Sequence, residues 1–132
     1  MRSVIISSAL LLVLIIAIAA NAYYINSIST ELLDLAFSLP SEYDYILNLD
    51  DYETEEYKTT INKLAAKWEK NSFRINLVSR YSDYERINTS VNSLKEYFFA
   101  GQYADYTAER KKLIAALEKQ KHNELAKFEN IF

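Results

Sequence analysis

The sequence predicts an all-α protein, with an N-terminal transmembrane helix followed by a three- to four-helix antiparallel bundle. The first observation behind this prediction is an uncharged apolar run from Val4 to Ala20. The second is that the whole chain holds one Gly and one Pro, although average usage is about 7 % and 5 %. Few turn-forming residues favour few, long helices. The third is a heptad spacing of apolar residues in the second half of the chain, which is typical of helices that pack side by side.

Residues 1–25 are predicted to form a membrane anchor. Between Val4 and Ala20 the only polar side chains are Ser7 and Ser8. As a helix, this run is about 25 Å long, and its extension to Ile25 is about 33 Å long, against a hydrocarbon core of ~30 Å. We therefore expect residues 4–25 to contact the lipid bilayer.

A cleaved signal peptide is the alternative interpretation of the same segment. Arg2 supplies a basic start, and Ala20-Asn21-Ala22 is a small-x-small cleavage pattern. Cleavage would release a secreted helical protein. The apolar run is longer than the roughly 7–15 residues of a signal-peptide core, which favours the anchor.

Because Arg2 is the only base before Lys58, we expect a cytoplasmic N-terminus and an extracytoplasmic C-terminal domain at the cell membrane.

Residues 26–53 are predicted to be a helical extension and an acidic connector. Apolar residues spaced three and four apart continue the first helix until Pro40 ends it, giving one helix of about 35 residues. Ser41 is expected to cap a short helical turn, followed by a loop near Asp50 and Asp51. The apolar positions of the extension are Ile28, Leu32, Leu35 and Leu39.

Charge is unevenly distributed along the chain. Between Thr30 and Glu56 there are nine acids and no base, whereas the rest of the chain to Phe132 has fourteen bases and nine acids. A segment this poor in Lys and Arg argues against docking onto anionic lipid headgroups beside the anchor. One alternative function is a metal-binding protein or enzyme that uses the acidic 42–56 segment. The segment lacks the glycine and terminal glutamate of an EF-hand loop, so we predict no metal site.

Residues 54–132 are predicted to form the helical bundle domain. Its first helix runs from Thr54 to about Arg80. The polar seam residue Asn71 either sets the register of the seam from a buried position or, as we favour, faces solvent near a kink. The remaining seam residues are Tyr57, Ile61, Leu64, Trp68, Ile75 and Val78.

A further two helices complete the predicted bundle. Ser82 and Glu85 form a capping-box pattern at the start of the first, and Gly101 stands where a left-handed residue ends it. The second starts near Tyr103–Asp105 and ends near Asn130. Their inward residues are predicted to be Tyr84, Ile87, Val91, Leu94 and Phe98, then Tyr106, Arg110, Leu113, Ile114, Leu117, Leu125 and Phe128.

The residue inventory excludes most catalytic chemistry. One His and no Cys exclude Cys-His catalysis and the common zinc sites. His122 and Glu118 are expected to be a surface pair, one helical turn apart. A single glycine excludes a phosphate loop, and an acidic domain disfavours nucleic acid as a partner. We predict no enzyme activity, no catalytic residue and no cofactor, but a structural or protein-interaction module with a protein partner or self-association.

Two short segments carry a family resemblance. They are Leu64-Ala65-Ala66-Lys67-Trp68-Glu69-Lys70 and the terminus Phe128-Glu129-Asn130-Ile131-Phe132. With the N-terminal anchor, the chain resembles the domain of unknown function 4363 family, small membrane-anchored helical proteins of Gram-positive bacteria. The resemblance implies a helical fold at the membrane and implies no activity. Ile131 and Phe132 are expected either to fold back onto the bundle or to form an exposed docking peptide.

Overall fold

The computed structural model describes residues 1–131, and in that range the chain is all-helical without β-strands. The five helices are α1 (Arg2–Phe37), α2 (Tyr43–Leu47), α3 (Asp51–Val78), α4 (Tyr81–Phe99) and α5 (Tyr103–Ile131). The prediction of an all-α chain with one long apolar N-terminal helix is therefore confirmed.

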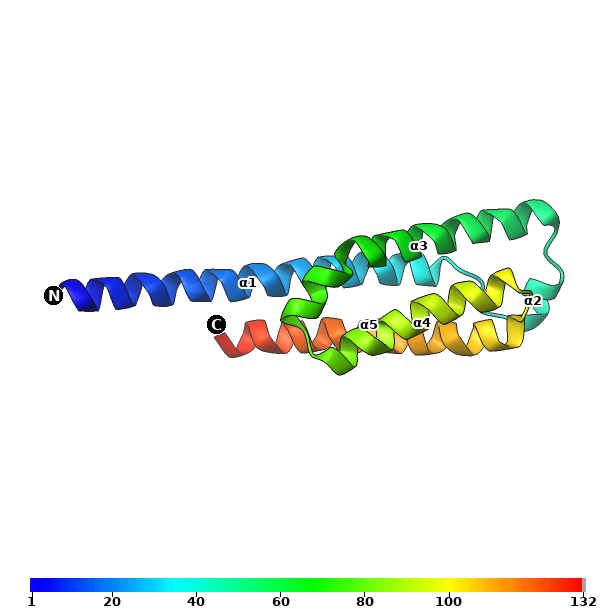
Figure 1. The fold of residues 1–132 in the computed structure, drawn as a ribbon. Helices are drawn as coiled ribbons and strands as arrows, with labels where there is room; N and C mark the ends of the chain where they lie inside the picture. The colour runs from blue at the N-terminus through cyan, green and yellow to red at the C-terminus, as the bar shows by residue number, and fades with distance from the viewer. Residues whose placement is uncertain (132) are drawn as a thin grey trace.

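Four helices lie side by side, and each runs opposite to its neighbours (Figure 1). The second half of α1 contacts α5 and α3, and α4 also contacts α5 and α3, so the contacts close a ring. The first half of α1 projects from one end of this bundle, and α2 covers the other end (Figure 1). We call these the near end and the far end.

Helix α1 continues unbroken from the apolar run into the bundle. It has 36 residues, close to the predicted length, and it ends three residues before Pro40. Ile25, Leu32 and Ala36 are fully buried, so one face of the extension forms core. The Tyr106 hydroxyl of α5 donates a hydrogen bond of 2.8 Å to the Pro40 carbonyl oxygen, which fixes the chain where α1 ends.

The connector is shorter than predicted. The N-cap of α2 is Glu42 rather than Ser41. Helix α3 begins at Asp51, three residues before the expected Thr54, because the Asp50 side chain accepts a 2.7 Å hydrogen bond from the Glu53 amide. An aspartate at this position satisfies an amide that lacks a partner within the helix. The predicted loop at Asp50 and Asp51 is therefore a helix start.

The predicted seam of α3 forms core, with one difference. Ile61, Leu64, Trp68 and Ile75 are buried. Asn71 does not face solvent, because its side-chain oxygen accepts a hydrogen bond from the Tyr24 hydroxyl of α1. The polar seam residue thus joins two helices.

The predicted capping box of α4 is wrong. The helix begins at Tyr81, with Arg80 in the N-cap position and no side-chain cap. The reason is tertiary: only two residues separate α3 from α4, and the side chain of Asp83 turns inward to α5. The predicted inward residues Ile87, Val91, Leu94 and Phe98 are buried.

The corner between α4 and α5 follows the prediction. Gly101 has a φ of 76°, a conformation that glycine adopts without steric cost. Its amide donates to the Phe98 carbonyl and the Gln102 amide donates to the Tyr97 carbonyl, which together form a Schellman motif. The bend places α5 back along α4.

Helix α5 matches its predicted inner face at most positions. Tyr106, Leu113 and Leu117 are buried, and the Arg110 Nε donates to the Ala36 carbonyl at 3.2 Å. Leu125 was predicted inside but is 44 % exposed, because buried Gln120 and Glu124 form the inner face of this part of α5. The side chains of Phe128, Ile131 and Phe132, and so the predicted roles of the terminus, lie outside what the structure describes.

Candidate functional site

The free half of α1 is a long, exposed apolar surface. Within residues 1–131, α1 is the helix that is long and apolar enough to cross a membrane, and none of its most apolar stretch is buried. Ile15, Ile18 and Ala19 become half-buried and Ala22 is buried. The exposed apolar helix therefore ends near residue 20, where the bundle begins.

A second group of exposed apolar side chains lies at the near end. Phe73 and Leu77 are on the outer face of α3, and Tyr81 follows at the start of α4; their exposed fractions are 74 %, 69 % and 68 %. We call these three residues the corner patch, after the α3–α4 corner that carries them (Figure 1). Sequence reasoning missed this patch, although Phe73 and Leu77 are large apolar residues outside the seam.

Aromatic rings connect the corner patch to the core. The Tyr81 ring centroid lies 6.3 Å from that of Tyr84, which lies 5.5 Å from that of Trp68. The Trp68 Nε1 donates a 2.9 Å hydrogen bond to the Asn88 side chain of α4. The corner therefore packs, through Tyr84, against the buried Trp68 of the core.

Polar side chains cross the bundle interior near the same end. The Ser29 hydroxyl of α1 donates to Gln120 of α5 at 3.0 Å. Buried Asp83 of α4 accepts from Asn123 at 3.0 Å and lies 3.6 Å from the Lys119 Nζ. Because each contact joins two helices and buried polar groups need partners, these contacts fix how the helices align lengthwise.

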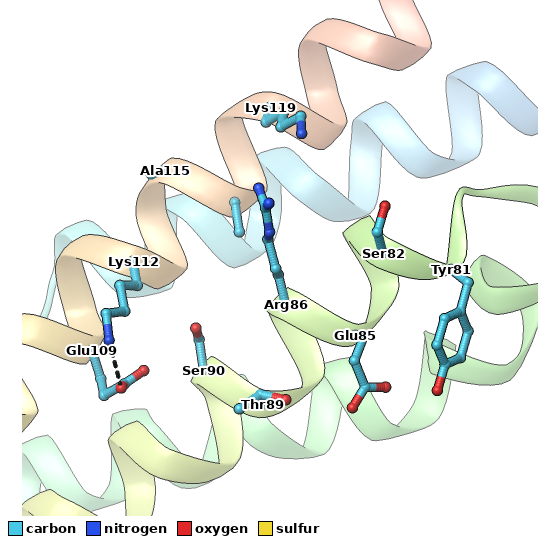
Figure 2. A pocket seen from close by; sticks show the side chains of 11 residues that line it. Tyr81, Ser82, Glu85, Arg86, Thr89, Ser90, Glu109, Lys112, Ala115 and Lys119 are labelled. Carbon is cyan, nitrogen blue, oxygen red and sulfur yellow. Dashed lines mark hydrogen bonds and ion pairs between the residues drawn. The ribbon is translucent and has the colours of Figure 1, made fainter.

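A surface groove lies between α4 and α5. It has a volume of about 810 Å³ and small residues in its floor, among them Ser90 and Ala116. Figure 2 shows Arg86 reaching from α4 toward α5, and Lys112 paired with Glu109 at 3.4 Å. The groove is lined by both acidic and basic side chains, among them Glu85, Arg86 and Lys119, so it is a mixed-charge surface.

The far end carries the acidic segment. Glu42, Asp44, Asp50 and Asp51 are exposed there. In the described residues, no group of three or more His, Cys, Asp or Glu side chains is placed to hold a metal ion. Glu118 and His122, the other pair considered from the sequence, are exposed on α5.

Tyrosines of the far end have raised pKa values. A hydrogen bond with Tyr45, followed by burial, raises the pKa of Tyr57 to about 12, and the two hydroxyl oxygens lie 3.3 Å apart. Burial also raises the pKa of Tyr106. The Tyr57 and Tyr106 hydroxyls therefore stay protonated at neutral pH and act as hydrogen-bonding groups.

No family model, curated protein or solved structure matches the chain. The resemblance to the domain of unknown function 4363 family therefore stays a prediction from the sequence.

Proposed function

We propose that the chain is a single-pass membrane protein whose bundle acts as a structural or protein-interaction module at the cell envelope. The observation that carries this proposal is the free half of α1, an apolar helix that no other described element covers. Monomeric soluble proteins rarely expose an apolar surface larger than a few hundred Å². Lipid is the environment that removes such a helix from water.

The continuity of α1 supports retention of the segment rather than cleavage. The pattern Ala20-Asn21-Ala22 lies in the middle of the 36-residue helix, and Ala22 is buried in the bundle. The residues on both sides of the pattern therefore belong to one rigid element. This favours a permanent anchor over a signal peptide.

The proposed orientation places the N-terminus in the cytoplasm and the bundle outside. It rests on Arg2, since Lys58 is the next base. The charge rule counts bases close in sequence to the span, so the bases of α3 to α5 do not oppose this orientation. We also propose membership of the domain of unknown function 4363 family, supported by the Trp68 segment.

The test combines a mass measurement with cysteine labelling. Because the chain has no cysteine, Ser3→Cys and Tyr52→Cys each introduce a single thiol. We expect the full mass starting at Met1 in the membrane fraction, and labelling of intact cells by a membrane-impermeant maleimide at position 52 but not at position 3. A mature protein that starts at Tyr23 would contradict the anchor, and the reverse labelling pattern would contradict the orientation.

A further inference from the structure

The corner patch lies on the same end of the bundle as the free half of α1 (Figure 1). Phe73 and Leu77 are one helical turn apart on α3, so they share a face. Tyr23 of α1 is 75 % exposed at the same level. Large apolar side chains are thus left uncovered at the end of the bundle where the apolar helix leaves it.

Basic side chains accompany these apolar residues. From Lys70 to Tyr81 the sequence holds Lys70, Arg74 and Arg80 and no acid. The Arg74 guanidinium carbon lies 3.8 Å from the centre of the Tyr24 ring, which places this charge directly beside α1. Apolar and aromatic side chains next to Arg and Lys are the composition that suits the boundary between lipid tails and phosphate headgroups.

This placement reverses one expectation from the sequence. The segment that follows the anchor in sequence is poor in Lys and Arg, which argued against contact with anionic headgroups. The fold carries the acidic connector to the far end, and α3 returns antiparallel to α1, so that the α3–α4 corner lies at the near end (Figure 1). Arg74 there lies beside Tyr24 of α1. The α3–α4 corner beside the apolar helix is therefore basic.

The length of the free helix provides an independent argument. The bundle covers one face of α1 from Ala22 onward, so lipid can surround the helix on all sides only along the run from Val4 to about Ala20. That run is about 25 Å long, shorter than a hydrocarbon core of ~30 Å. A short span is accommodated by thinning the bilayer or by drawing flanking residues into the interface. The flanking residues here are the near end of the bundle.

We propose that the α3–α4 corner is a second membrane contact. Phe73, Leu77 and Tyr81 insert at the level of the headgroups, and Arg74 and Arg80 bind the phosphates of anionic lipids. The inference rests on the proposed membrane anchoring and adds to it the lipid class and the face of the bundle that meets the bilayer.

The test measures the depth of spin labels on the full-length protein in vesicles of phosphatidylcholine and phosphatidylglycerol. Single-cysteine variants Phe73→Cys and Leu77→Cys report on the corner. Tyr52→Cys, an equally exposed aromatic position at the other end of α3, is the matched control, and Leu12→Cys reports on the anchor. Collisions with oxygen, which concentrates in lipid, are compared with collisions with a neutral, water-soluble nickel chelate.

We expect the label at position 12 to lie deep in the bilayer, labels at 73 and 77 to lie at shallow depth, and the label at 52 to be in water. Omitting phosphatidylglycerol is expected to move labels 73 and 77 toward water. If the labels at 73 and 77 are as accessible to the chelate as the label at 52 while position 12 is still deep, the corner contact is overturned and the anchor is left intact. Shielding of 73 and 77 from both reagents would show that protein, such as a second copy, covers the corner and would equally overturn it. Position 12 in water would overturn the anchor itself.

Discussion

The two ends of the bundle differ in what they expose and in what holds them. The near end exposes the apolar corner patch with three bases, and polar contacts such as Asp83–Asn123 cross its interior. The far end exposes acids and tyrosines together with Phe37, Leu47 and Phe99, and Asp50 caps α3 there. The chain has a net charge of −3, but its α3–α4 corner at the near end is basic and its connector at the far end is acidic. Such a polarity suits a protein that has one end at a membrane and the other in water.

The largest expected effect tests whether the near end is the structural support of the bundle. Trp68→Ala removes a buried ring that contacts Tyr84 and a hydrogen bond to Asn88. We expect a loss of about 3–5 kcal/mol in the free energy of unfolding, measured by urea titration with circular dichroism in detergent. Tyr52→Ala at the exposed far end is the control, with an expected change within about 0.5 kcal/mol. Equal losses in the two variants would remove the distinction between the ends.

The next effect tests the apolar helix outside the bundle. Leu12→Asp replaces an exposed leucine near the centre of the run and disfavours insertion by about 3–4 kcal/mol. The total gain from the apolar run is about 3–7 kcal/mol on the same scale. We therefore expect a large fall in the membrane-bound fraction, measured by fractionation, with little change for Leu12→Ile. Full retention of Leu12→Asp in the membrane would mean that α1 is not the anchor.

A smaller effect tests the polar interior of the near end. Asp83→Ala leaves the Asn123 amide and the Lys119 ammonium without their shared carboxylate. The expected loss is about 1–3 kcal/mol in the free energy of unfolding. Asp51→Ala, which removes an exposed acid at the far end, is the matched control. If the two variants unfold at the same urea concentration, the buried contacts of Asp83 add nothing to the free energy of unfolding.

The smallest effect concerns the far end and alkaline pH. The folded-state pKa of Tyr57 is about 12, raised from 10.0 mainly by the hydrogen bond with Tyr45. Because the folded pKa is the higher one, the stability it contributes is complete below pH 10 and is lost as the pH rises toward 12. Tyrosine absorbance during a pH titration checks this, and Tyr45→Phe should lower the Tyr57 pKa. An unchanged titration in Tyr45→Phe would assign the shift to another cause.

Local patterns in the sequence predicted most of the fold. Pro40, Gly101 and the seam residues around Trp68 specify helix ends and buried faces through geometry that only nearby residues determine. The prediction failed where a partner distant in sequence takes a side chain. Asn71 was expected in solvent but accepts from Tyr24, 47 residues away. Ser82 was expected to cap α4, but the helix begins at Tyr81, and the neighbouring Asp83 accepts a hydrogen bond from Asn123 of α5.

The candidate site shows the same limit. The apolar run was evident from composition, because a long uncharged segment is recognised without long-range information. The corner patch depends on the order in which α3 and α4 run beside α1, and sequence position alone placed its arginines far from the apolar helix. Only the antiparallel topology brings them together.

The pairing of α1 with α5 has a consequence for the order of folding. Ser29 and Gln120, which bond across this pair, are separated by 91 residues, and contacts between distant residues form slowly because a long loop must close first. During synthesis α1 is made before α5, so the part of its buried face that packs against α5 stays uncovered until α5 is made. Helices α3 and α4 are joined by a two-residue turn and can pair early. The bundle is therefore closed by its final helix, and truncations of α5 should leave the first helix without its partner.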